Sequence, residues 1–231
     1  MRYPGGKNGP GVWQRIINQI PPHTVYVEPF GGSAAVLRHK RRASRSMVFD
    51  VDPVAVAALR EWGLPPGTWV YERDGLAWLE RAEVESRWFV YCDPPYMLET
   101  RSKKRLYVRE LSDEEHRRLL EAVLGFECMV AVSGYPSRLY GELLDGWRVI
   151  EYDAMTRGGV RRECLWMNYA EPRELHDYQW LGDNFRERER FHRQQKRMVR
   201  KLQGMDRLQR LALAAAIAEY DEYAWPAAGR D

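Results

Sequence analysis

The chain has 231 residues, of which 45% are hydrophobic, so it can form one domain with a sizeable core and a small appendage. Its formal net charge of +3 is too small to identify a nucleic-acid-binding protein by itself. The three cysteines are an odd number, lie far apart in apolar stretches, and therefore indicate buried thiols in a reducing compartment. Because there is no apolar run of about 18 residues and the start is polar and glycine-rich, we predict a soluble cytoplasmic protein without membrane contacts.

Short β-prone runs alternate with helical patterns through most of the chain. The predicted strands are residues 25–27, 47–49, 69–71, 88–92, 129–132 and 164–169, and the predicted helices are 34–38, 54–62, a short stretch ending at 83, and 111–124. The last helix has the spacing of a capping box, with Ser112 followed three residues later by Glu115. This alternation predicts an α/β fold with a doubly wound, mainly parallel sheet.

Four of the predicted strands end at an acidic residue. These residues are Glu28, Asp50, Asp74 and Asp93. In doubly wound sheets, ligands bind beyond the carboxyl ends of the strands, so the four acids should meet at one rim of the sheet.

The first of these strands runs into the turn Glu28-Pro29-Phe30-Gly31-Gly32. Glycines at this point let a ligand approach the main chain, although an ordinary strand-to-helix turn explains them equally well. The run matches neither a P-loop nor the full dinucleotide-binding fingerprint. Asp50, after the next strand, is suited either to accept hydrogen bonds from a ribose or to cap a helix.

The most informative segment is Asp93-Pro94-Pro95-Tyr96. The two prolines stiffen the chain and remove backbone donors, so the segment presents mainly acceptors. The Asp93 carboxylate and the Pro94 carbonyl are suited to hold the two N–H groups of an exocyclic amine, and the Tyr96 ring is suited to stack on an extruded base. An Asp-Pro turn beside a structural tyrosine is the alternative interpretation.

Taken together, the motifs resemble those of the Dam-like DNA adenine N6 methyltransferases. The resemblance covers roughly residues 1–170 and runs, in order, through Tyr3-Pro4-Gly5-Gly6-Lys7, the glycine turn, Asp50, Asp93-Pro94-Pro95-Tyr96, Ser133-Gly134-Tyr135 and the strand 165–169. It implies a Rossmann-like methyltransferase sheet with S-adenosylmethionine as cofactor. The implied cofactor-binding residues are Tyr3, Lys7, Glu28, Pro29, Phe30, Gly31, Gly32, Asp50, Asp74 and Asp93, and the implied catalytic residues are Asp93, Pro94, Pro95 and Tyr96.

The sequence departs from the family pattern in two places. Ala34 stands where the last glycine of the family's glycine loop is usual. Members that read a defined site often insert a recognition domain between the positions of Asp74 and Asp93, where this chain has only 18 residues. We therefore expect short or relaxed sequence specificity.

Contacts to DNA must then come from elsewhere in the chain. One candidate is the basic loop with Arg101, Lys103, Lys104, Arg105 and Arg109, which could neutralise phosphates. The other lies in residues 171–231, which we expect to form a basic helical C-terminal extension after a catalytic domain of residues 1–170. Between residues 186 and 210 there are ten Lys/Arg and only three acids, and the apolar residues of this segment keep roughly helical spacing. Packing of this helix on the core, or self-association of the protein through it, is the competing interpretation.

Rival functions remain open at the level of sequence. The same acceptor cluster could serve cytosine N4 methylation or RNA methylation, and a non-catalytic nucleic-acid-binding module on the same fold is a third alternative. The five histidines have no ligand spacing, so no metal is expected.

Overall fold

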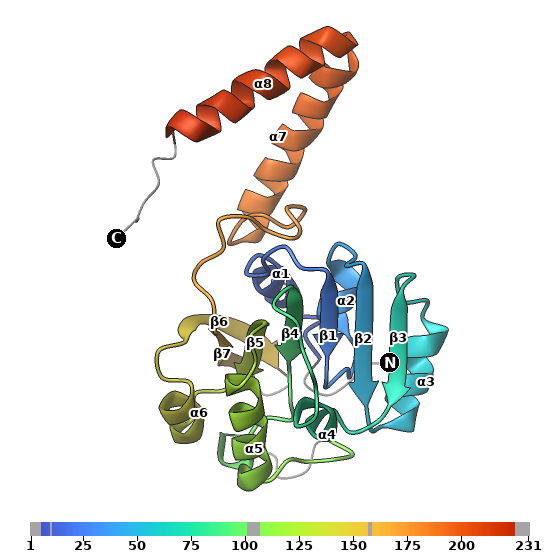
Figure 1. Ribbon diagram of the computed structural model, residues 1–231, viewed down its shortest axis with the longest axis vertical. Coiled ribbons are helices and arrows are strands. Elements are labelled where there is room, and N and C mark those ends of the chain that lie inside the picture. Colours follow the sequence, from blue (N-terminus) through green and yellow to red (C-terminus); the bar gives the residue numbers. More distant parts are fainter. Residues whose placement is uncertain (1–5, 10, 101–106, 157–158, 225–231) are drawn as a thin grey trace. The chain divides into compact units, whose positions relative to one another are not determined.

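A computed structural model describes residues 6–9, 11–100, 107–156 and 159–224 of the chain (Figure 1). Internal contacts divide the chain into two compact units, Met1–Trp180 and Leu181–Asp231. Residues 171–180 belong to the first unit, where the His176 backbone N–H donates to the Ile20 carbonyl at 2.8 Å and the Trp180 indole donates to the His39 carbonyl at 3.1 Å. No described helix has the length and apolar composition needed to cross a bilayer.

The first unit is built on one seven-stranded sheet with the strand order β3-β2-β1-β4-β5-β7-β6. Strands β1 to β5 run parallel, whereas β7 pairs antiparallel with both of its neighbours. The strand bounds are β1 Val25–Glu28, β2 Arg45–Asp50, β3 Thr68–Glu72, β4 Trp88–Cys92, β5 Met129–Gly134, β6 Arg148–Thr156 and β7 Gly159–Met167. The doubly wound, mainly parallel sheet predicted from the sequence is confirmed.

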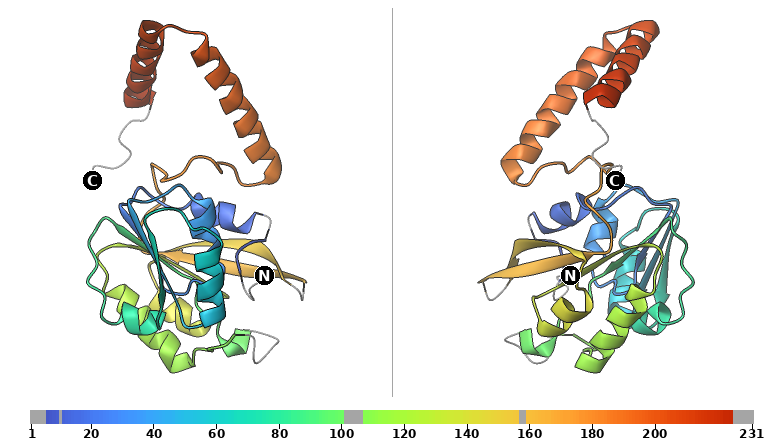
Figure 2. Two further views of the ribbon diagram at one scale, coloured as in Figure 1. Left: turned by 90° about the vertical axis from the view of Figure 1, so that its right-hand side faces the viewer. Right: turned by 60° about the vertical axis from the view of Figure 1, so that its left-hand side comes forward.

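Helices cover both faces of this sheet (Figure 2). Apolar side chains of α1 (Val12–Ile17), α2 (Ala35–His39) and α3 (Pro53–Glu61) belong to one hydrophobic cluster. Those of α4 (Gly75–Leu79), α5 (Asp113–Leu124) and α6 (Arg138–Leu143) belong to a second cluster. Strands β1, β2, β4 and β5 between the two layers are therefore mostly buried, as expected for the inner strands of a doubly wound parallel sheet. A short 3-10 turn, Leu98–Thr100, follows β4.

The local signals behind several predicted elements have the expected structural basis. Ser112 and Glu115 form the predicted capping box at the start of α5, since each side chain accepts a backbone N–H of the other residue. Strand β4 has the predicted bounds because its five residues are apolar or aromatic and all but the first are buried. The three cysteines are free and buried, as expected.

Other elements differ from the prediction. Strand β6 and helices α1 and α6 were not predicted, and the last strand begins at Gly159 rather than at Cys164. The C-terminal basic helix, predicted as one element, is two helices, α7 (Phe185–Gln203) and α8 (Arg207–Ala224). The break has a local cause, because Gly204 caps α7 and the Asp206 carboxylate accepts the Gln209 N–H at 2.9 Å, which starts a new helix.

Candidate active site

A pocket open to solvent lies at the carboxyl ends of β1, β2 and β4. The strand order reverses between β1 and β4, and ligands of doubly wound sheets bind at such a switch point. Of the residues predicted for the cofactor or for catalysis, those that line the pocket are Lys7, Glu28, Pro29, Phe30, Gly31, Gly32, Asp50, Asp74, Asp93 and Pro95.

Some predicted residues are not among the pocket-lining residues. Tyr3 lies outside the described part of the chain, as do Arg101, Lys103, Lys104 and Arg105 of the basic loop. Pro94 is buried, and Tyr96, which is 6% exposed, belongs to the cluster around Asp93 described below.

The glycine turn after β1 is held tightly against β2. The Gly31 N–H donates to the Phe49 carbonyl at 2.7 Å, and a Cβ on Gly31 would lie only 2.4 Å from the Val48 side chain. Ala34, which stands at the usual family glycine, adopts a left-handed conformation with φ 45°, unlike any other non-glycine residue that the structure describes. The backbone therefore keeps the conformation that glycine favours, at a cost of about 1 kcal/mol or more for alanine.

Glu28 faces into the fold. Its Oε1 accepts hydrogen bonds from the Tyr26 hydroxyl at 2.8 Å and from the Leu37 N–H at 2.9 Å. Burial raises the pKa of Glu28 to about 7, against the lowering effect of these two hydrogen bonds. Glu28 therefore links β1 to α2 at the base of the pocket.

Asp50 organises the turn after β2. Its two carboxylate oxygens accept the Gly32 N–H at 2.7 Å and the Asp52 N–H at 2.8 Å, which ties the glycine turn to the end of β2. Burial raises the pKa of Asp50, while these hydrogen bonds act in the opposite direction. The cap of α3 is Asp52, whose side chain accepts the Val54 N–H, so the alternative interpretation of Asp50 as that helix cap is wrong.

Asp74 and Arg109 meet at the rim of the pocket. Asp74 caps α4 through the Leu76 N–H at 2.9 Å, and its second oxygen lies 3.1 Å from the Arg109 guanidinium. Arg109, the described residue of the predicted DNA-binding loop, also pairs with Glu115 at 2.7 Å and lines the pocket. Its side chain is 41% exposed, so it remains accessible from solvent.

Asp93 follows β4 and forms an ion pair with a buried lysine. Lys7 Nζ lies 2.7 Å from Asp93 Oδ1 and 3.3 Å from Glu163 Oε2, and it also donates to the Tyr96 hydroxyl. Both side chains line the pocket, but Lys7 is 3% exposed and Asp93 is 18% exposed, so the carboxylate is the more accessible of the two. The Asn8 amide, which donates to Ser33 Oγ at 2.9 Å, holds this N-terminal segment against the glycine turn.

Sequence reasoning missed Glu163 and Tyr152. Glu163 is buried on β7 and accepts hydrogen bonds from the Tyr96 hydroxyl at 2.9 Å and from the Tyr152 hydroxyl at 3.3 Å. Strand β7 pairs with β5 only from Cys164 onward, so Glu163 lies just beyond the end of β5, next to the site. The available signal was a lone acid directly before an apolar strand, and the predicted strand began one residue too late to include it.

The pKa values in this cluster follow from burial and from its shared cation. Burial opposes the charge of Lys7, but Asp93 and Glu163 outweigh that effect and raise the Lys7 pKa well above its ordinary value. Burial raises the pKa of Asp93, and Lys7 limits the rise. Lys7 therefore stays a cation, while Asp93 is a carboxylate that takes up a proton more readily than an exposed aspartate.

An aromatic wall stands beside Asp93. Tyr135 packs edge-to-face on Tyr96 with ring centroids 4.6 Å apart, and the Arg161 guanidinium lies 5.8 Å from the Tyr135 ring centroid. Tyr91, which lines the pocket, shares a 2.8 Å hydrogen bond with Ser133 at the end of β5. The predicted Ser133-Gly134-Tyr135 motif thus lies close to the Asp93 motif in space.

The charge of the pocket suits a cationic ligand. Its lining includes five carboxylates, Glu28, Asp50, Asp52, Asp74 and Asp93, against the two cations Lys7 and Arg109. Among the described residues, no group of His, Cys, Asp and Glu side chains has the arrangement of a metal site.

The sequence matches no protein-family model and no curated protein. Solved structures with a similar fold include a putative methyltransferase from Streptococcus mutans in complex with SAH, with 10% identity and a TM-score of 0.46 over 67% of this chain and 93% of that one. The 23S rRNA methyltransferase ErmE has 16% identity and a TM-score of 0.45 over 71% and 68% of the two chains. A precorrin 8w decarboxylase from Methanobacterium thermoautotrophicum has 14% identity and a TM-score of 0.43 over 67% and 86%. These similarities concern the fold and carry no argument about reaction or substrate.

Proposed function

We propose that this protein is an S-adenosylmethionine-dependent methyltransferase that methylates the N6 amino nitrogen of adenine in DNA. The observation that carries the proposal is the position of Asp93-Pro94-Pro95-Tyr96, which follows β4 directly at the switch point of the sheet, with its carboxylate paired to Lys7 on the pocket wall. A stiff group of acceptors is thereby brought beside the pocket at the ends of the parallel strands.

The pocket residues fit the proposed cofactor. S-adenosylmethionine would supply a methyl group on a positively charged sulfur, and the excess of carboxylates in the lining favours such a cation. Gly31 lets the turn that lines the pocket lie directly against β2, because a Cβ there would be 2.4 Å from the Val48 side chain. Asp50, which ends β2 and lines the pocket, is suited to accept ribose hydroxyls.

The residues at Asp93 suit an exocyclic amine. The Asp93 carboxylate and the Pro94 carbonyl would each accept one N–H of the amine, which aims the nitrogen lone pair away from them and favours pyramidalisation. As the new N–CH₃ bond forms and the S–CH₃ bond breaks, the nitrogen loses one proton. Asp93 is placed to accept that proton, because burial raises its pKa.

The target base must leave the duplex to reach this site, and the protein contributes alignment and exclusion of water. The Tyr96 ring would face the extruded base, with its orientation fixed by the hydrogen bond from its hydroxyl to Glu163 at 2.9 Å and by the edge of Tyr135. The aspartate at the first motif position favours adenine over cytosine through the family resemblance, since cytosine enzymes more often carry serine there.

Short or relaxed sequence specificity is part of the proposal. Between Asp74 and Asp93 the chain forms only α4 and β4, so it has no inserted recognition domain at this point. Contacts to phosphates give affinity without sequence information.

The proposal is tested by comparing the protein with Asp93→Ala in two assays. The first measures transfer of a labelled methyl group from S-adenosylmethionine to unmethylated duplex DNA, and the second measures cofactor affinity by calorimetry. We expect Asp93→Ala to lose turnover by at least about 100-fold, the scale of a positioned acid–base group, while the dissociation constant of the cofactor changes less than about tenfold. A loss of activity fully explained by lost cofactor binding would overturn the role given to Asp93.

A further inference from the structure

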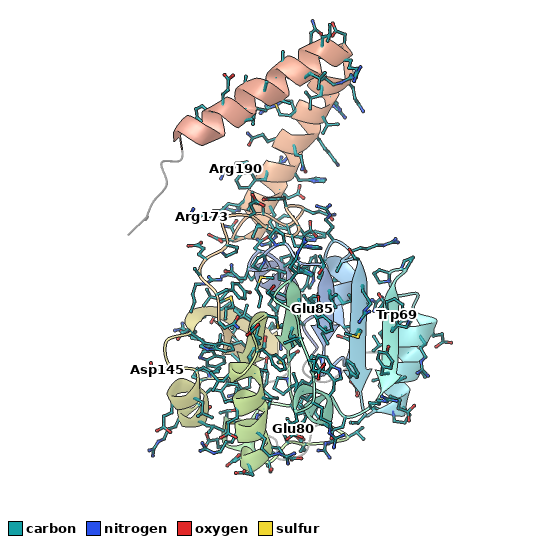
Figure 3. All side chains as sticks on the ribbon, viewed as in Figure 1. Trp69, Glu80, Glu85, Asp145, Arg173 and Arg190 are labelled. Carbon is teal, nitrogen blue, oxygen red and sulfur yellow. The ribbon has the colours of Figure 1, made fainter. Side chains whose placement is uncertain are left out.

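The second unit carries a continuous basic surface on one side of α7. We call it the basic face of α7 and define it as Arg186, Arg190, Arg193, Arg197, Arg200 and Lys201. The five arginines are separated by steps of three or four residues, and Lys201 lies four residues after Arg197, so their side chains project from the same side of the helix. All six are exposed, and Figure 3 shows Arg190 projecting from α7.

A different side of α7 carries apolar residues. Phe191, Met198 and Leu202 are separated by seven and four residues and therefore lie on one side of the helix, away from the basic face. The start of α8 approaches the helix end at this point, where the Arg210 guanidinium donates to the Met205 carbonyl at 2.7 Å. The basic face is therefore separate from the side at which the two helices join.

The basic face has no ion-pair partner among the described residues of its unit. The acids within α7 are Glu187 and Glu189, and Glu187 takes part in the helix cap through the Asp183 N–H at 2.9 Å. Like charges at this spacing destabilise a helix by a few tenths of a kcal/mol per pair, so an anionic partner would relieve a real cost.

The composition and length of the face suit a phosphate backbone. Five of its six members are arginines, whose planar guanidinium forms paired hydrogen bonds with phosphate oxygens. From Arg186 to Lys201 the helix rises by about 22 Å, which corresponds to about six base pairs of duplex. Arg193, Lys196, Arg197, Arg200 and Lys201 also line one surface depression, so the cations lie close together around a common space.

We propose that the basic face of α7 is a docking surface for the phosphate backbone of duplex DNA. This inference rests on the proposed function. The basic face would supply contacts to the DNA substrate, because the catalytic unit has no inserted recognition domain between Asp74 and Asp93 to supply them. The face binds without reading bases, since guanidinium contacts to phosphates carry no sequence information. Because both units belong to one chain, docking by α7 raises the effective concentration of DNA at the catalytic unit.

The test is the salt dependence of DNA binding. The test variant is the full chain with Arg190, Arg193, Arg197 and Arg200 each replaced by Gln, a residue of similar helix propensity, and circular dichroism checks that α7 stays folded. Binding of a duplex of about 20 base pairs, made only of G·C pairs, is measured without cofactor at several salt concentrations. We expect the slope of log K against log salt to become shallower by about 3 to 4 units.

A matched control removes the same number of positive charges, four, from the first unit instead. It replaces Arg42, Arg81, Arg87 and Arg117, all exposed, by Gln. We expect the control to keep a slope within about one unit of the unchanged protein. An equal change of slope in both variants, or no change in the α7 variant, overturns the proposal.

Two further measurements address other partners. Loss of binding to phosphatidylserine vesicles in the α7 variant, with DNA binding unchanged, would assign the face to a membrane surface and overturn the proposal. A changed sedimentation coefficient with an unchanged DNA slope would assign it to self-association, with the same consequence. The duplex contains no adenine and the binding assay contains no cofactor, so its outcome does not depend on methylation. The docking proposal can therefore fail while the proposed function stands, and the proposed function fails only if adenine is not methylated.

Discussion

Replacement of Lys7 by Met tests the electrostatics of the site directly. The substitution keeps the length of the side chain but removes the cation that lies 2.7 Å from Asp93 and 3.3 Å from Glu163. Lys7 is 4% exposed, and removing one partner from a buried ion pair typically costs about 3–5 kcal/mol. We therefore expect Lys7→Met to lower the free energy of unfolding by about that amount near pH 7.5, measured by urea denaturation.

The loss should depend on pH in one direction. Without Lys7 the pKa of Asp93 rises further above its ordinary value, because Lys7 is what limits the rise. A carboxyl group whose pKa is higher in the folded than in the unfolded protein makes its full contribution to stability below the unfolded-state pKa. That contribution is lost as the pH rises through the folded-state pKa. The deficit of Lys7→Met should therefore shrink towards pH 4 and grow towards pH 8.

A double-mutant cycle with Glu163→Gln completes this test. Glu163→Gln removes one of the two carboxylates that share Lys7, so the double variant should be more stable than the sum of the single effects predicts, by about 1–3 kcal/mol. Two results would refute the claim that Asp93 and Glu163 share the buried Lys7 cation. One is a loss of unfolding free energy below about 1 kcal/mol in Lys7→Met, and the other is additivity of the two substitutions within about 0.5 kcal/mol.

Two other substitutions test the floor of the pocket. Glu28→Gln keeps an acceptor for the Tyr26 hydroxyl and the Leu37 N–H. Burial raises the pKa of Glu28 from 4.5 to about 7, so the folded state favours the protonated form. Between pH 4.5 and 8, the free energy of unfolding of the unchanged protein should therefore fall by about 3 kcal/mol relative to that of the variant. A difference in unfolding free energy that is flat with pH would contradict this. Gly75→Ala places a Cβ 1.8 Å from the Pro29 carbonyl oxygen, so we expect a loss of more than about 2 kcal/mol and weaker cofactor binding by calorimetry. Its control is Gly141→Ala on α6, where the added Cβ has no neighbour within 4 Å and we expect a gain in unfolding free energy of about 0.5–1 kcal/mol. Equal effects of the two substitutions would refute the close approach of Gly75 to Pro29.

The strands of the fold could be predicted because their cause is local. Trp88 to Cys92 forms an apolar run bounded by polar residues, and such a run needs burial on both faces wherever it lies in the sheet. Strand β6 was missed because its cause is not local. Its outer residues, such as Glu151 and Asp153, are exposed, and it is fixed mainly by its long antiparallel pairing with β7.

The site could be predicted in part for the same reason. Asp50 is the last residue of β2 and Asp93 directly follows β4, and the parallel sheet brings such residues together at one edge. Glu163 belongs to the antiparallel strand β7, whose register with β5 brings it to the site from the other direction. Neither the spacing nor the neighbours of Glu163 in the sequence encode that register, so its contact with Lys7 follows only from the folded sheet.

The central claim is the identity of the methylated nucleoside. The measurement is incubation of the protein with labelled S-adenosylmethionine and unmethylated duplex DNA, or RNA of the same sequence, followed by digestion and nucleoside analysis. We expect label in N6-methyladenine from DNA, in short or variable sequence contexts, and at least about 100-fold less label with Asp93→Ala. Label in N4-methylcytosine or only in RNA would contradict the proposed substrate, and no label in either nucleic acid would contradict the proposed reaction.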